Sequence, residues 1–447
     1  MHSPDQQARS RTLDDHFLFS SAREQAETEP TDHPDIISVQ SLQKAFPDVE
    51  LFDTLSHTSW PVISDWPRFG ALAFKIEHME PDSAAADNVV IHLARILQAV
   101  CRKTNGIWGR IDHELLGCLV PEKTQSQCMA VAETIKKRFS EGRAETLSVG
   151  VAMFPTLSYE KYRIIDNAGK AIAHAAFFGP GAVTAFDAVS LNISGDRFYQ
   201  ENDIDGAISE YRLALMLDPK NINVHNSMGV CHGIRGELDA ALGYFTTAME
   251  LDTKEIMPVY NVGYVYFLKK DYSRALDYFL QAGQIDAGVF EIALQTGRVY
   301  LEIKQPEKGI PHLEAASRLN PKSAAAQRLL GDALTSLNRI AEAETAYKTA
   351  LKNNPHDAAS LSALSALYDA RGENADIALM FGKQAVDIDP ENGLFQHRLG
   401  RLYLSRSRLE EALDAFQQAQ DLGHDAWEDI TAALRLIRAS DSSLHSN

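Results

Sequence analysis

The sequence predicts an α+β domain followed by an all-α solenoid, and three observations lead to this fold class. Strand-length apolar runs alternate with amphipathic helical segments between residues 70 and 186. Beyond residue 190, small residues recur every 34 positions within helical patterns. The first 36 residues are polar, which predicts a disordered leader. The expected divisions are a leader at 1–36, an α+β domain at 37–189, helical repeats at 190–424, a capping helix at 425–438 and a free tail at 439–447.

The α+β domain is expected to contain five strands and three main helices after a short helix at 39–45. Strands alternate apolar and polar side chains, whereas helices repeat them at a period near 3.6. The expected order is a strand at 70–79, a helix at 82–102, two short strands with a turn at 111–114, a helix at 126–141, a strand at 146–154, a helix at 158–178 and a strand at 182–186. Ferredoxin-like α+β sheets have this rhythm.

Three segments of this domain resemble the GGDEF family of diguanylate cyclases. LSVGVAMFP (147–155) and NAGKAIAHAAFFGPGAVTAFD (167–187) are similar to the last two conserved segments of that family, and GRIDHELLGCLVP (109–121) occupies the place of its signature hairpin. The resemblance covers about residues 68–187. It implies a nucleotide-cyclase-like fold and a bacterial setting.

The resemblance also implies that the catalytic chemistry of that family is missing. Asp112 and His113 stand where the family has two glycines beside the nucleotide, and Glu114 matches one metal-binding acid. Lys75 replaces the other acid, and an ammonium group cannot bind Mg²⁺. We therefore expect no enzyme activity, no catalytic residue, no cofactor and no metal at this degenerate cyclase site. We expect Lys75 to pair with Glu114, the alternative being that Lys75 extends into solvent.

The helical half contains columns of small residues in phase with one another. One small column is Gly195, Gly229, Gly263, Gly297, Gly331, Ser365 and, after one inserted residue, Gly400. Small residues are needed where two helices touch, because a larger side chain would hold them apart. Four repeats end in proline, which terminates a helix. These columns resemble the tetratricopeptide repeat (TPR) pattern in seven copies, and the resemblance implies stacked helix pairs with a concave binding face.

The candidate partner-binding residues lie in this concave groove. Tyr260, Tyr264 and Phe267 fall on one helical face, and an arginine follows in each of the next two repeats and in the last. The complete predicted set is Tyr260, Tyr264, Phe267, Arg298, Arg328 and Arg401. Aromatic and guanidinium groups suit a peptide with an apolar anchor and an acidic group. The alternatives are that some of the aromatic residues pack between helices and that Arg328 pairs with Asp332.

Composition restricts the class of protein and of partner. The chain has 447 residues and a net charge of −18, which argues against nucleic acid and anionic membranes as partners. Four cysteines without metal-binding spacing are typical of reduced thiols in a cytosolic protein. No apolar run is long enough to span a membrane. A cytoplasmic location is expected, and a homodimer is left open.

These observations favour a non-catalytic scaffold or signalling adaptor that binds a protein or peptide in the TPR groove. The alternative is a receptor in which the GGDEF-like domain binds GTP or a cyclic dinucleotide and signals to the TPR array. Glu114 and Asp87, which matches a guanine-contacting acid of the family, are the residues that support the alternative.

Overall fold

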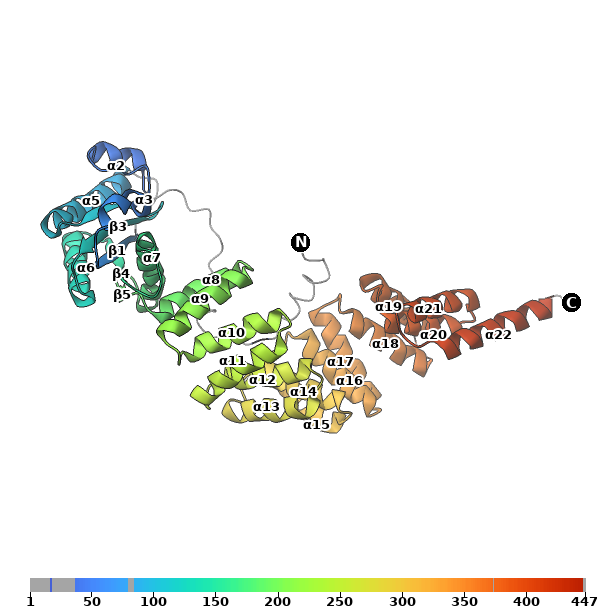
Figure 1. Ribbon diagram of the computed structural model, residues 1–447. Coiled ribbons are helices and arrows are strands. Elements are labelled where there is room, and N and C mark those ends of the chain that lie inside the picture. The colour runs from blue at the N-terminus through green and yellow to red at the C-terminus, as the bar shows by residue number, and fades with distance from the viewer. Residues whose placement is uncertain (1–16, 18–36, 79–83, 373, 445–447) are drawn as a thin grey trace. The chain divides into compact units, whose positions relative to one another are not determined.

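The structure is a computed structural model that describes Phe17 and residues 37–78, 84–372 and 374–444 (Figure 1). It contains two compact units, Met1–Pro258 and Val259–Asn447. The expected leader therefore lies outside the described residues, with the exception of Phe17. The first two residues expected in the helix at 82–102 lie in the undescribed stretch 79–83 as well.

The first part of unit 1 is a five-stranded sheet with the order β2-β3-β1-β4-β5. The strands are β1 (Phe69–Glu77), β2 (Ile107–Arg110), β3 (Leu115–Pro121), β4 (Thr146–Phe154) and β5 (Val183–Ala185). β1 is central and antiparallel to β3 and β4, whereas β5 runs parallel to β4. The predicted sequence of strands and helices and the turn at 111–114 are confirmed.

Helices cover both faces of this sheet (Figure 1). They are α5 (Ala84–Thr104) and α6 (Gln125–Ser140) on one face and α7 (Ile164–Ala175) on the other. β1 alternates between the two cores, because Leu72 and Phe74 pack with α5 and α6 while Ala71 and Ala73 pack with α7. α7 approaches β4 so closely that a Cβ at Gly150 would lie 1.9 Å from the carbonyl oxygen of Ala168. Glycine is therefore required at the centre of β4.

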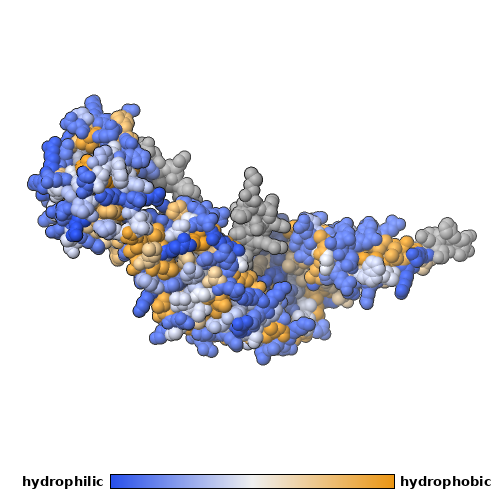
Figure 2. Space-filling model, in the orientation of Figure 1, coloured by the Kyte–Doolittle hydropathy of each residue, from blue (hydrophilic) through white to orange (hydrophobic). Residues whose placement is uncertain are grey.

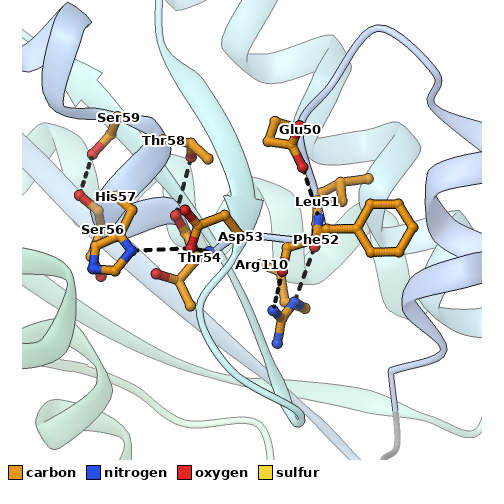
Figure 3. Close-up of polar contacts among 10 residues, drawn as sticks. All are labelled: Glu50, Leu51, Phe52, Asp53, Thr54, Ser56, His57, Thr58, Ser59 and Arg110. Atoms are coloured by element: carbon orange, nitrogen blue, oxygen red, sulfur yellow. Dashed lines mark hydrogen bonds and ion pairs between the residues drawn. The ribbon is translucent and has the colours of Figure 1, made fainter.

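The segment before the sheet forms three short helices, α2 (Val39–Ala45), α3 (Leu55–Thr58) and α4 (Trp60–Ile63). The first confirms the helix expected at 39–45. The other two were not predicted, because four residues carry too little periodicity. Figure 3 shows how Arg110 fixes this segment: its guanidinium donates to the carbonyl oxygens of Leu51 and Phe52, at 3.1 and 3.0 Å.

In the described part of the chain, seven helix pairs follow the sheet. Unit 1 contains α8 (Ala188–Gln200), α9 (Ile204–Leu217), α10 (Ile222–Ile234) and α11 (Leu238–Leu251). α12 (Ile256–Leu268) crosses the boundary between the units. Unit 2 continues with α13 (Tyr272–Ile285), α14 (Phe290–Glu302), α15 (Pro306–Leu319), α16 (Ala324–Ser336), α17 (Ile340–Asn353), α18 (Ala358–Arg371), α19 (Ala375–Ile388), α20 (Gly393–Leu404) and α21 (Leu409–Asp421). The C-terminal part is thus a TPR-like helical solenoid. The last helix, α22 (Trp427–Leu444), passes the end expected at residue 438 and includes the first part of the expected free tail, because no glycine or proline interrupts it.

Six of the seven helix pairs are closed by one recurring contact. A glycine of the first helix faces a large side chain that lies 16 residues later, in the second helix. A Cβ added at each of these glycines would meet that side chain at 2.4–2.9 Å; the pairs are Gly195–Tyr211, Gly229–Phe245, Gly263–Phe279, Gly297–Leu313, Gly331–Tyr347 and Gly400–Phe416. The small residues predicted from the sequence therefore leave room for a second column, made of large side chains, which the sequence analysis did not identify.

The surface is mixed, with apolar residues scattered among hydrophilic ones on the face drawn in Figure 2. Exposed large apolar side chains occur in both units, for example Phe178, Met216 and Trp427. Of the described helices, none combines the length and hydrophobicity of a membrane span.

We expect Gly297→Ala to lower the stability of unit 2, because the new methyl group would lie 2.5 Å from Leu313 Cγ. Overpacking of this kind costs about 1–3 kcal/mol. Gly283→Ala is the matched control, since its methyl group would meet Ile292 at an ordinary 3.7 Å and alanine favours helix. Thermal unfolding followed by circular dichroism should show a lower Tm for Gly297→Ala only. Equal Tm values for the two variants would contradict the proposed role of the glycine column.

Candidate functional site

The three aromatic residues predicted on α12 form one row in unit 2. Tyr260 stacks on Tyr264, with ring centroids 6.3 Å apart, and Tyr264 stacks on Phe267 at 6.1 Å. Tyr260 also packs against Phe279 of α13 at 5.3 Å. Because α12 places residues i, i+4 and i+7 on one face, the row follows the helix axis.

The two ends of this row differ in exposure. Tyr260 and Tyr264 are 0% and 3% exposed, so they form a packed floor, in line with the alternative that some aromatics pack between helices. Phe267 is half-buried, and the Arg298 guanidinium of α14 lies 4.7 Å from its ring centroid. This is a cation–π contact. The accessible part of the row is therefore Phe267 beneath Arg298.

Burial raises the pKa of both tyrosines above that of an ordinary phenol, which is itself neutral near physiological pH. Burial raises the pKa of Tyr264 to about 12, although the positive charge of Arg298 opposes the shift. Burial also raises the pKa of Tyr260 well above its ordinary range. The phenol groups thus act as hydrogen-bonding groups and not as anions.

The other predicted arginines occupy different environments. Arg328 on α16 is 3.6 Å from carboxylate oxygens of both Asp332 and Asp357. The pairing with Asp332 is the alternative considered above, and Asp357 adds a second partner from the start of α18. Asp332 also accepts a hydrogen bond from Tyr347 at 2.7 Å. Arg401 on α20 is exposed. Arg298 and Arg328 therefore do not contribute equally to a positive surface, because two carboxylates neutralise the charge of Arg328.

The residues predicted to form a degenerate cyclase site lie on β1 and at the β2–β3 hairpin of unit 1. Lys75 Nζ is 3.5 Å from Glu114 Oε2, so the expected pairing is present. Asp112 Oδ1 accepts hydrogen bonds from the backbone nitrogens of Glu114 and Leu115, at 2.7 and 2.8 Å. Asp112 is thus a turn-stabilising residue. His113 is exposed, and its carbonyl oxygen accepts a hydrogen bond from the backbone of Ile37.

Other groups at this end of unit 1 are also engaged with the protein. Asp87 Oδ2 accepts a hydrogen bond of 2.5 Å from Ser41 of α2. In the part of the chain that the structure describes, no three His, Cys, Asp or Glu side chains are arranged to hold a metal ion.

Lys170 of α7 pairs with Glu210 of α9 at 2.6 Å, which connects the sheet domain to the first helix pair. The sequence did not predict this ion pair, because no local pattern links a lysine and a glutamate that lie in different domains.

We predict that Tyr264→Phe reduces the alkaline destabilisation of unit 2. The pKa of Tyr264 is about 12 in the folded protein and 10 for the unperturbed side chain, so the stabilisation is complete below pH 10. It is lost as pH rises from 10 to 12, because the unfolded chain releases its proton first. The parent should therefore lose about 1–3 kcal/mol more than the variant over this window. Thermal unfolding at several pH values tests this, with Tyr162→Phe, at a more exposed site, as the control.

Three solved structures are similar to part of the chain. "Crystal structure of YrrB: a TPR protein with an unusual peptide-binding site" has 24% identity and a TM-score of 0.37, covering 42% of this chain and 96% of that one. A tetratricopeptide repeat protein from Parabacteroides merdae has 20% identity and a TM-score of 0.44, with coverage of 56% and 98%. PilF of Pseudomonas aeruginosa has 21% identity and a TM-score of 0.44, with coverage of 47% and 95%.

Among curated proteins, none matches the chain. The family described as "Cilia and flagella-associated protein 70 C-terminal domain", whose model carries the TPR designation, matches residues 169–435. The match covers all seven helix pairs and more than half of the chain. The chain therefore belongs to the family of the cilia and flagella-associated protein 70 C-terminal TPR domain.

Proposed function

We propose that this protein is a non-catalytic scaffold or signalling adaptor whose TPR helix pairs bind a protein or peptide partner. The observation that carries the proposal is the Arg298–Phe267 pair at the accessible end of a packed aromatic row. Among the described residues, no carboxylate forms an ion pair with Arg298. A guanidinium held over an aromatic ring without an acidic partner is available to bind an incoming acid.

The chemistry of these groups suggests what the partner presents. An apolar side chain of the partner would pack on the half-buried ring of Phe267, and an adjacent carboxylate would bind Arg298. Tyr260 and Tyr264 would support Phe267 from below without touching the partner, since both are buried. Arg328 is a weaker candidate, because two carboxylates already neutralise it. Arg401 is exposed and would extend the surface toward the last repeat.

The sheet domain is proposed to be a degenerate GGDEF-like, nucleotide-cyclase-like domain of residues 37–189. Its order of strands and helices supports this proposal, and the Lys75–Glu114 pair at the place of the metal is consistent with lost catalysis. The repeat boundary at 190–424, a cytoplasmic location and a bacterial origin belong to the same proposal.

The nucleotide-receptor alternative is disfavoured by the surroundings of its two acids. Asp87 accepts a short hydrogen bond from Ser41, and Glu114 is paired with Lys75. A nucleotide would have to displace both contacts, and Asp112 would add negative charge beside its phosphates.

We expect calorimetric titration of the intact protein with GTP or cyclic di-GMP to release no binding heat at millimolar ligand. The same titration of the Lys75→Asp variant, which lacks the cation at the place of the metal, shows whether that cation is what prevents nucleotide binding. Saturable heat with the parent protein would favour the receptor over the scaffold.

We expect Arg298→Glu to weaken partner binding at least about tenfold, as for an interfacial arginine that contributes strongly to binding. Arg318→Glu makes the same charge change on the exposed surface of α15 and serves as the control. The assay is affinity capture from native cell extract, read by mass spectrometry, with circular dichroism to check folding.

A protein retained by the parent and by Arg318→Glu but lost by Arg298→Glu would support the proposed surface. Retention by all three proteins would move the site to another face of the repeats or to the sheet domain. If the parent retained nothing, the scaffold proposal would lose its basis.

A further inference from the structure

Phe17 is buried against α10 and α11, the second helix pair of unit 1, although these helices lie far from Phe17 in the sequence. Its side chain is 5% exposed. Its ring stacks on Phe245 of α11, with centroids 5.9 Å apart and an angle of 27° between the planes. On another side its ring atoms lie against Gly233 of α10. An aromatic residue of the N-terminal region thus contributes to the packing of the TPR helices.

The space that Phe17 fills exists because one repeat lacks a side chain. Gly233 lies four residues after the column glycine Gly229. The residues at the same place in the other six repeats all carry a side chain; they are Tyr199, Phe267, Leu301, Thr335, Asp369 and Leu404. A Cβ at Gly233 would lie 2.6 Å from the Phe17 ring. Phe17 therefore lies where the other repeats carry a side chain of their own.

Backbone geometry does not explain the glycine. Gly233 lies inside α10 and is not among the residues with positive φ, so any L-residue could adopt its conformation. Glycine within a helix is unfavourable relative to alanine. What glycine offers at this position is room, and the room is occupied by a ring from elsewhere in the chain.

We propose that Gly233 and Phe245 form a binding site for a phenylalanine side chain, here called the Phe17 site, and that Phe17 occupies it as an intramolecular ligand. A flat ring fits between the Phe245 ring and the bare helix backbone at Gly233. A small side chain would leave this space empty, and a charged one would be buried without a partner. A peptide of the same chemistry must displace Phe17 in order to bind.

This proposal does not rest on the partner surface proposed above, because Phe267 and Arg298 lie in unit 2 and the Phe17 site lies in unit 1. A tethered ligand acts at a high effective concentration, so it competes strongly with a free peptide. The intact protein should therefore bind such a peptide weakly until Phe17 is removed.

The test uses a fluorescein-labelled peptide of residues 10–24, SRTLDDHFLFSSARE, and the full-length chain. Fluorescence anisotropy should show that the Phe17→Ala chain binds this peptide at least tenfold more tightly than the parent chain does. The same peptide with Phe17→Ala should not bind, whereas the peptide with Phe19→Ala should bind as the original does. Loss of binding with both altered peptides, or with neither, would overturn the proposal.

A second pair of variants tests the site itself, in the Phe17→Ala chain. Gly233→Leu fills the space with its own side chain and should abolish peptide binding. Gly243→Leu makes the same change on α11, where a Cβ meets no atom within 4 Å, and should leave binding unchanged. Tight binding to a folded Gly233→Leu protein would overturn the proposal. If Gly233→Leu does not fold, the comparison of the two altered peptides tests the proposal instead. Failure of the Phe17→Ala chain to bind the original peptide would also overturn the proposal.

Discussion

The helical half of this protein depends on one steric contact, a glycine of one helix facing a large side chain of the next. Each helix alone has an apolar face that must be covered. The contact lets two helices approach closely enough to cover each other, and a single methyl group at the glycine would intrude on the facing side chain. Ser365 and Phe381 hold the equivalent positions in the sixth repeat. In that repeat, α18 ends at the exposed residue Arg371 and is followed by Gly372, which adopts the left-handed conformation.

Sequence reasoning recovered the features that have a local signature. The five strands follow from alternation of apolar residues, and the helix pairs follow from a fixed period of small residues. The large column opposite the glycines was missed, because tyrosine, phenylalanine and leucine share it and no single residue type recurs. The helices α3 and α4 were missed because four residues define no period.

The candidate site was predicted only in part, for a physical reason. Spacing along α12 predicts that Tyr260, Tyr264 and Phe267 share a face, and this holds. Spacing does not predict exposure, which depends on the neighbouring helices. Likewise, the pairing of Arg328 with Asp332 is an i, i+4 contact that sequence can suggest, whereas the pairing with Asp357 comes from another repeat. The placement of Phe17 on α10 and α11 has no local signal at all.

The two kinds of architecture in this chain impose different demands on folding. In the helix pairs, the central contact joins residues that are 16 positions apart, so only a short loop must close. In the sheet, β1 pairs with β4 across most of the domain, from Phe69 to Phe154. Loop closure of that length must be completed before the pairing stabilises it. We therefore expect the helix pairs to fold quickly and locally, while the sheet domain, although it is synthesised first, reaches its native state last.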